Sequence, residues 1–213
     1  MTTALKIETG LHSNITAVQL RREYVTLRII GAISDDMLPQ TVAAIQGARQ
    51  AKQPMLVVHI HSQGGDVDVG VAIAEELALC KKQGMIIVTV IESEAQSMGA
   101  FLFTCGSKGY RFMGPHAYLM IHEASWTVGG KAADTVNKAE HLRRANQMLL
   151  RRMSVNIGRP PDYLDTVLAD NRNVDLYISP EEAVAHGFLQ SGTHIAVPTL
   201  EVAFGPKFQL NIN

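Results

Sequence analysis

The stretch PMLVVHIHSQGGDVDVGVAIAEELALCKKQGMIIVTVIE, residues 54–92, decides the fold class. It holds two runs of consecutive apolar and β-branched residues, 54–61 and 85–92, which are typical of strands buried on both faces. Between them, residues 70–83 repeat apolar positions with a helical period and end in lysines, which favour a helix C-terminus. A strand, a helix and a second buried strand predict a βαβ unit in a parallel sheet.

The same alternation continues on both sides of this stretch. YVTLRII (24–30) has the composition of a strand, and residues 37–53 have the period of a helix. Downstream, residues 97–105 predict a helix and YLMIH (118–122) predicts a strand. We therefore expect an α/β fold in which helices lie on the faces of a parallel sheet.

Residues 132–157 form the longest periodic segment of the chain. Apolar residues recur there every three or four positions over about seven helical turns, with arginines on the other face, before Gly158 and Pro160 end the pattern. Such a helix either projects from its domain towards a second copy or lies along its own domain, and the pattern favours neither. Farther on, SPEE (179–182) is a capping box that predicts a short helix from Pro180.

Composition limits the classes of protein to consider. The 213 residues fit one domain, with 46% hydrophobic and 18% charged residues, and a net charge of −1 offers no patch for nucleic acid or an anionic membrane. No apolar run reaches the roughly 18 residues of a membrane span, and MTTALKIETGLHSN lacks the features of a secretory signal. Cys80 and Cys105 lie in apolar settings, as buried free thiols do. We expect a cytoplasmic protein.

Ser97 is the first candidate for chemistry. In ESEAQSMGAFLF (92–103) it follows the strand 85–92 after a short polar connection and opens an apolar helix. A serine there caps the helix in most proteins, but it also lies at the sheet edge where α/β folds bind ligands. The amides of Met98 and Gly99 are unsatisfied first-turn donors that can stabilise an oxyanion.

Two glycines follow the strand 54–61 in HSQGGDVDVG (61–70). Gly64 and Gly65 allow a tight turn whose backbone amides can approach a bound group. The spacing is not that of a phosphate-binding loop. The stretch is therefore either a strip of exposed backbone beside the helix of Ser97 or a glycine turn without a ligand.

A serine nucleophile needs a base and an acid that orients it. His122, just beyond the strand 118–122, is the candidate base, and His116 is its nearest competitor, although a histidine at a strand end is more often structural. The candidate acids are downstream, and the pattern does not choose among Asp162, Asp165, Asp170 and Asp175.

A metal site receives little support from the pattern. His59 and His61 share a strand face, and Asp66 and Asp68 have the same spacing, but no third strong ligand lies nearby in the sequence. We expect neither a metal nor a cofactor.

Residues 54–190 resemble the family of ClpP, the proteolytic subunit of Clp protease. The motifs are SQGG, SMGAFL followed by G-x-K-G-x-R-F, MIH 25 residues after the serine, and DLYISPEEA. The resemblance implies Ser97 as nucleophile, His122 as general base and Asp175 as orienting acid, with an oxyanion hole at Gly65 and Met98. It thereby selects Asp175, which the pattern alone did not.

The same resemblance implies a fold and an assembly. The fold is a crotonase-like spiral of βαβ units, one domain over residues 1–213, with a protruding handle (125–158) made of a strand near 125–130 and the long helix. The activity is that of a self-compartmentalising serine endopeptidase, in seven-membered rings that can stack as a tetradecamer. Protein substrates reach such rings through an AAA+ ATPase partner, and the subunit uses neither a metal nor a cofactor.

Two segments depart from the family. Residues 1–23 match its N-terminal part poorly, which puts ATPase docking in doubt, and the tail 191–213 runs past its usual end. Both departures are typical of a divergent member, such as a phage-encoded or accessory protease. The alternatives are a phage protease that matures capsid or scaffold proteins, a crotonase-like acyl-CoA enzyme, and an inactive ring subunit.

Overall fold

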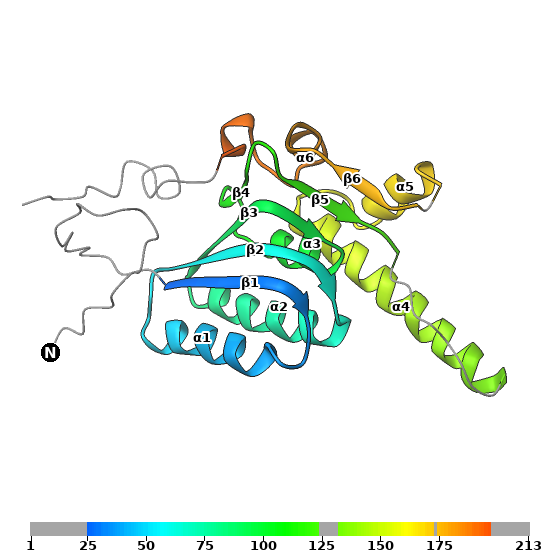
Figure 1. Ribbon diagram of the computed structural model, residues 1–213, viewed down its shortest axis with the longest axis horizontal. Helices are drawn as coiled ribbons and strands as arrows, with labels where there is room; N and C mark the ends of the chain where they lie inside the picture. Colours follow the sequence, from blue (N-terminus) through cyan, green and yellow to red (C-terminus); the bar gives the residue numbers. More distant parts are fainter. Residues whose placement is uncertain (1–24, 124–131, 173, 197–213) are drawn as a thin grey trace, which may run out of the picture.

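A computed structural model describes residues 25–123, 132–172 and 174–196 (Figure 1). The N-terminal segment 1–23, the expected handle strand near 125–130 and most of the tail 191–213 lie outside these ranges. The elements follow in the order β1 (Val25–Ile33), α1 (Leu38–Gln50), β2 (Met55–Gly65), α2 (Val67–Lys82), β3 (Ile86–Gln96), α3 (Met98–Thr104), β4 (Arg111–Met113), β5 (Tyr118–Ile121), α4 (Ala132–Asn156), α5 (Tyr163–Asp170), β6 (Leu176–Ile178), α6 (Pro180–His186) and a 3-10 turn (Gly192–His194).

The strands form one six-stranded sheet in the order β1-β2-β3-β5-β6, with β4 also paired to β3. All pairs are parallel except β5 with β6, which is antiparallel. The predicted α/β fold is confirmed. The sequence pattern predicted parallel strands and did not indicate the antiparallel pair of β5 and β6 at one edge of the sheet. β4 and α5 were not predicted as separate elements, because each is too short to show a clear period.

A large buried cluster joins the sheet to the helices. Its most buried members include Ile29 of β1, Ile60 of β2, Ile73 of α2 and Phe101 of α3, each at most 1% exposed. A second, small cluster consists of strand residues alone, namely Met55, Val57, Val88, Val90 and Phe112. Both predicted free thiols, Cys80 and Cys105, are present and buried.

The ends of β2 and β3 differ from the sequence expectation. β3 does not stop at Glu92 but continues through ESEAQ to Gln96, because Glu94, Ala95 and Gln96 pair with β5. β2 likewise extends to Gly65, and α2 begins at Val67 instead of residue 70. The polar connection expected before Ser97 is therefore strand, since pairing with a neighbouring strand outweighs local polarity.

The long helix α4 confirms the periodic segment 132–157. Figure 1 shows its N-terminal half extending away from the sheet, while its C-terminal half lies near α3 and contacts it. Leu149, Leu150 and Met153 in that half are buried, whereas Val136 is 68% exposed. One half of the helix thus projects from the domain and the other packs along it, while the packing of a second copy against the projecting half stays a prediction.

Arg111 of β4 connects the ends of three helices. Its guanidinium is 1% exposed and donates to the carbonyls of Gly106 after α3, Asn156 at the end of α4, and Gly187 and Phe188 after α6. Burial lowers the pKa of Arg111 to about 10. Carbonyls at helix C-termini carry partial negative charge, so they compensate a buried cation that has no carboxylate beside it.

The capping box at the start of α6 is also confirmed. Ser179 Oγ accepts from the amide of Glu182, and the carboxylate of Glu182 accepts from the amide of Ser179. In the part of the chain that the structure describes, no helix has both the length and the apolar character of a membrane span.

Candidate active site

Ser97 lies alone between β3, which ends at Gln96, and α3, which begins at Met98. Its backbone has φ 51° and ψ −115°, a region that costs a residue other than glycine on the order of 1–3 kcal/mol. Its side chain makes no capping hydrogen bond to the helix. The interpretation of Ser97 as a simple helix cap is therefore wrong, and its hydroxyl is available to another group.

The backbone on both sides of Ser97 is held by hydrogen bonds. Its amide donates to Met120 O at 2.8 Å, and its carbonyl accepts from Phe101 N at 3.0 Å in the first turn of α3. Gln96 is paired with Met120 in the parallel register of β3 and β5. These contacts tie Ser97 to the strand that leads, two residues later, to His122.

His122 follows β5 directly and reaches Ser97. Its Nε2 lies 2.8 Å from Ser97 Oγ, within hydrogen-bond distance, and its side chain is 25% exposed. His116, the competitor in the sequence, lies before β5 and is exposed. The end of β5 thus brings together the histidine and the serine that the sequence singled out.

Asp175 is the aspartate that the structure pairs with His122. In the antiparallel register of β5 and β6, Ile121 is opposite Leu176, so the next step puts His122 opposite Asp175. Asp175 Oδ1 lies 3.5 Å from His122 Nδ1, an ion-pair distance longer than a hydrogen bond, and the carboxylate is 54% exposed. The other three candidates occur in or next to α5: Asp162, Asp165 and Asp170.

The glycine pair predicted as a turn is instead the end of β2, where Gly64 pairs with Ala32 and Gly65 with Ile33 of β1, and it lies against Ser97. A Cβ added to Gly64, where φ is +94°, would come within 2.8 Å of both Gln96 O and Ser97 Cβ, and 3.2 Å of Met98 N. A Cβ on Gly65 would lie 2.2 Å from Ile33 O of β1. Both glycines are therefore required by close backbone approach, and this end of β2 lies between β1 and the start of α3.

A small apolar pocket opens beside the two candidate groups. It holds about 30 Å³ of free space and is lined by Ser97 and His122 together with Val67, Met98, Phe101, Ile121, Asn146, Leu149, Leu150 and Met153. Most of these residues come from α3 and the buried half of α4. The pocket therefore has room for an apolar group next to the hydroxyl of Ser97.

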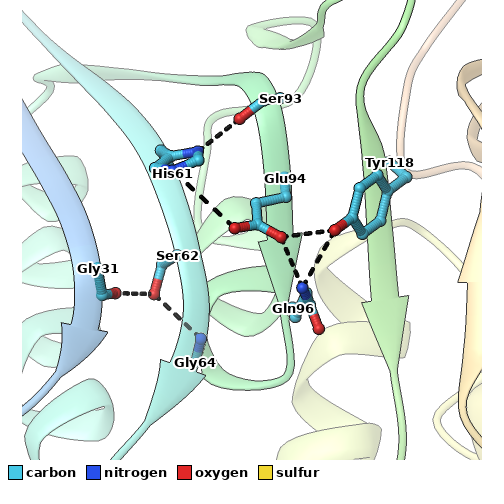
Figure 2. A network of polar contacts seen from close by, with 8 residues as sticks. All are labelled: Gly31, His61, Ser62, Gly64, Ser93, Glu94, Gln96 and Tyr118. Carbon is cyan, nitrogen blue, oxygen red and sulfur yellow. Dashed lines mark hydrogen bonds and ion pairs between the residues drawn. The ribbon is translucent and has the colours of Figure 1, made fainter.

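A polar network occupies the end of β3 just before Ser97 (Figure 2). Glu94 Oε2 accepts from Tyr118 Oη at 2.6 Å and from Gln96 Nε2 at 2.6 Å, and His61 lies 3.9 Å from its other oxygen. The hydrogen bonds from Tyr118 and Gln96 lower the pKa of Glu94 below its usual value of 4.5. The alternating polar residues of ESEAQ are the sequence signal for this network. The prediction that they form a polar connection between a strand and the helix of Ser97 is wrong, because they belong to β3.

Three of the four residues considered for a metal have other partners, and the fourth, Asp68, is exposed in the first turn of α2. His59 Nδ1 lies 2.7 Å from Glu92 Oε1, His61 bonds to Ser93, and Asp66 caps α2 through Val69 N. Burial lowers the pKa of His59, although the charge of Glu92 opposes this shift. Over residues 25–123, 132–172 and 174–196, the structure contains no group of three His, Cys, Asp or Glu side chains arranged to hold a metal ion.

A serine hydroxyl beside an imidazole that in turn faces a carboxylate is the arrangement found in serine hydrolases, where the imidazole acts as the base. Here the three groups come from the ends of β3 and β5 and from the start of β6, on strands that are direct neighbours in the sheet.

Comparison with known proteins identifies the family. The sequence profile of the Clp protease family matches residues 12–192, and the chain belongs to this family. One curated relative is the ATP-dependent Clp protease proteolytic subunit 1 of Frankia casuarinae, 28% identical over 162 residues, which cover 75% of this chain and 73% of the relative. The resemblance seen in the motifs is thereby confirmed, and at this identity the chain is a divergent member.

Proposed function

We propose that this chain is a serine endopeptidase that cleaves peptide bonds through an acyl-enzyme. The observation that carries the proposal is the 2.8 Å contact between Ser97 Oγ and His122 Nε2 in a member of the Clp protease family. A serine hydroxyl is a weak nucleophile until a neighbouring base removes its proton, and imidazole is the side chain best suited to do so near neutral pH.

In the proposed mechanism, Ser97 Oγ attacks the carbonyl carbon of the peptide bond while His122 takes the hydroxyl proton at Nε2. Asp175 keeps the ring oriented and stabilises the imidazolium that forms. His122 then gives this proton to the leaving amine, the C–N bond breaks, and an ester to Ser97 remains. Water activated by the same imidazole hydrolyses the ester and restores the hydroxyl.

The amides of Gly65 and Met98 are proposed to stabilise the oxyanion. Met98 is the first residue of α3, so its N–H has no acceptor within the helix, while the N–H of Ser97 is already bonded to Met120. Gly64, at the end of β2, lies against Met98 N. Donors held in place before the reaction stabilise the developing charge at no further cost of reorganisation.

The pocket beside Ser97 is proposed to receive a substrate side chain. Its walls are apolar apart from Ser97, His122 and Asn146, and its free space of about 30 Å³ fits a side chain better than a larger group. We therefore expect the enzyme to prefer an apolar residue on the acyl side of the bond that it cleaves.

Assembly belongs to the same proposal. The named relative is a subunit of an ATP-dependent protease, and α4 exposes apolar side chains, Val136 in its projecting half and Met148 in the half that packs on the domain. We propose that copies of this chain assemble into seven-membered rings. These rings would receive unfolded protein chains from an AAA+ ATPase. No cofactor enters the proposed mechanism.

The decisive experiment compares two serines at helix starts. Ser97→Ala should abolish both the cleavage of a fluorogenic peptide and labelling by a fluorophosphonate probe. Ser179→Ala is the matched control: Ser179 truly caps its helix, so this variant should lose about 1 kcal/mol of stability and keep its labelling.

The mass of each variant in solution, measured alongside, separates loss of chemistry from loss of assembly. Undiminished labelling of Ser97→Ala in a protein of unchanged mass would remove Ser97 from the role of nucleophile and overturn the proposed function.

A further inference from the structure

Ser62 lies in β2 at a point where the sheet is irregular on both sides. The register with β1 shifts between Ile30 and Ala32, and the register with β3 shifts between Ile60 and Ser62. The side chain of Ser62 is fully buried, with 0% exposure. A buried polar group at such a point needs hydrogen-bond partners, and those partners define what it does.

The hydroxyl of Ser62 bridges two glycines, as Figure 2 shows. It donates to Gly31 O of β1 at 2.6 Å and accepts from Gly64 N at 3.1 Å. It therefore satisfies both a carbonyl at the irregular point of β1 and an amide at the end of β2. The hydroxyl helps to hold this end of the strand, since Gly64 has a φ of +94° and no side chain of its own to pack.

Ser62 also touches the helix that carries the proposed nucleophile. A Cβ added to Gly99 in the first turn of α3 would lie 3.1 Å from Ser62 O and 3.2 Å from Ser62 Cβ. Gly64, at the end of β2, lies against Ser97 and Met98 N. Ser62 is thus in contact with both backbone segments that carry the proposed oxyanion donors.

We propose that Ser62 is a positioning residue that sets the distance between the amides of Gly65 and Met98. This inference rests on the proposed function, because it assigns Ser62 to the oxyanion hole of that reaction. Such donors act through their placement, and a misplacement by about 1 Å lowers an enzymatic rate by roughly a hundredfold. Ser62 itself touches neither the substrate nor the reacting atoms.

The chain contains a matched control for Ser62. Ser154 of α4 is also 0% exposed, donates to Leu150 O at 2.8 Å and accepts from Leu164 N at 3.1 Å. Alanine at either position removes one hydroxyl, one donated bond and one accepted bond from a buried site. Only Ser62 contacts the proposed oxyanion segments, so a difference in catalysis between the two variants reports positioning.

The experiment measures Ser62→Ala and Ser154→Ala with a fluorogenic peptide and with a peptidyl boronate, which forms a tetrahedral adduct with a serine nucleophile. Both variants should show a similar fall in melting temperature. Ser62→Ala should lower kcat by about ten- to a hundredfold, leave KM within about twofold, and weaken boronate inhibition by the same factor as kcat. Ser154→Ala should keep the kcat of the unaltered protein.

A third variant, Ser62→Cys, should fall between the unaltered protein and Ser62→Ala, because a thiol is a weak donor and acceptor. It also replaces Ser62→Ala as the test should the alanine variant fail to fold. The inference is overturned if Ser62 variants match Ser154→Ala in kcat, or if their kcat falls while boronate affinity stays unchanged.

Ser97→Ala separates this inference from the proposed function. Loss of labelling in Ser97→Ala together with normal turnover in Ser62→Ala rejects the positioning role alone. Persistent labelling of Ser97→Ala rejects the proposed function, and the role of Ser62 with it.

Discussion

Ser97 keeps an unfavourable backbone conformation because both of its peptide groups are held. Its φ of 51° is rare for a residue with a side chain, yet its amide is bonded to Met120 O and its carbonyl to Phe101 N. The strain directs the hydroxyl away from the helix and towards His122. Because alanine meets the same backbone restriction, Ser97→Ala leaves the strain in place and changes the chemistry alone.

Asp175 allows a second test at the scale of single residues. It lies 3.5 Å from His122 Nδ1, farther than a hydrogen bond, and is half exposed. In the proposed mechanism this carboxylate orients the imidazole and stabilises the imidazolium. We expect Asp175→Asn to lower kcat by about a hundredfold or more, and by less than the loss of Ser97, as is seen for the acid of known serine proteases.

Asp170→Asn is the control for this prediction, since Asp170 ends α5 and was an equal candidate in the sequence. Its kcat in the peptide assay should stay within about twofold of that of the unaltered protein. Equal losses in the two variants would contradict the selection of Asp175.

At the scale of elements, the site depends on which strands are neighbours. β3 ends at the serine, β5 ends at the histidine, and β6 begins after the aspartate. The order β3-β5-β6 in the sheet brings these three ends to one edge. Among the described residues, strand pairing thus brings the three groups into two contacts, Ser97 with His122 and His122 with Asp175.

Arg111 joins the ends of three helices, as strand pairing joins the ends of the strands. Its guanidinium donates to four carbonyls at or just beyond the ends of α3, α4 and α6, and replacement by methionine would remove this donor from all four. We expect Arg111→Met to lower the free energy of unfolding by on the order of 3 kcal/mol, measured by urea denaturation.

Arg143→Met is the matched control, because Arg143 also makes several hydrogen bonds but lies exposed on α4, paired with Glu140. Its free energy of unfolding should change little, since exposed ion pairs are screened by solvent. A loss in Arg143→Met as large as that in Arg111→Met would argue against the role of Arg111 in joining helix ends.

At the scale of the whole molecule, three partly buried histidines make stability depend on pH. Burial is the largest influence on each and lowers the pKa of His59, His186 and His194 below the ordinary value of 6.5. Between these lowered pKa values and 6.5, the unfolded chain binds more protons than the folded chain does. The stability contributed by the three groups is therefore complete above pH 6.5 and is lost as the pH falls below it.

We expect the melting temperature to fall between pH 7.5 and pH 5.5 for this reason. A variant with glutamine at positions 59, 186 and 194 should show a smaller fall over the same range, because its side chains do not titrate there. Equal falls in the two proteins would show that other groups dominate the pH dependence.

The sequence predicted the elements better than their pairing. Buried apolar runs and helical periods located β1, β2, β3, α1, α2 and α4, since those signals are local. The end of β3 was missed because the pairing of Glu94 and Gln96 with β5 is not visible in a polar stretch. Arg111 gave no local sign of burial, because its partners lie 5 to 77 residues away.

In the candidate site, too, the residues with a local sequence signal were predicted from the pattern and those that depend on strand pairing were not. Ser97 and His122 stood out because each comes directly after a strand, and the two glycines stood out because they follow the apolar run 54–61. Asp175 required the resemblance to a family, since its place opposite His122 depends on the register of β5 and β6 over 53 positions of chain, that is 175 − 122. Ser62 was not considered, because a serine in a strand gives no hint that its hydroxyl bridges Gly31 and Gly64.

The antiparallel pair of β5 and β6 also determines where this chain can change its length. Residues may be inserted or deleted between α4 and β6 without moving Asp175, provided that Leu176 still pairs with Ile121. One residue added within β6 would instead turn the carboxylate to the opposite face of the sheet. We therefore expect the connection around α5 to tolerate changes of length, and the chain from Asp175 through β6 not to tolerate them. Loop grafting or circular permutation should leave β6 unchanged.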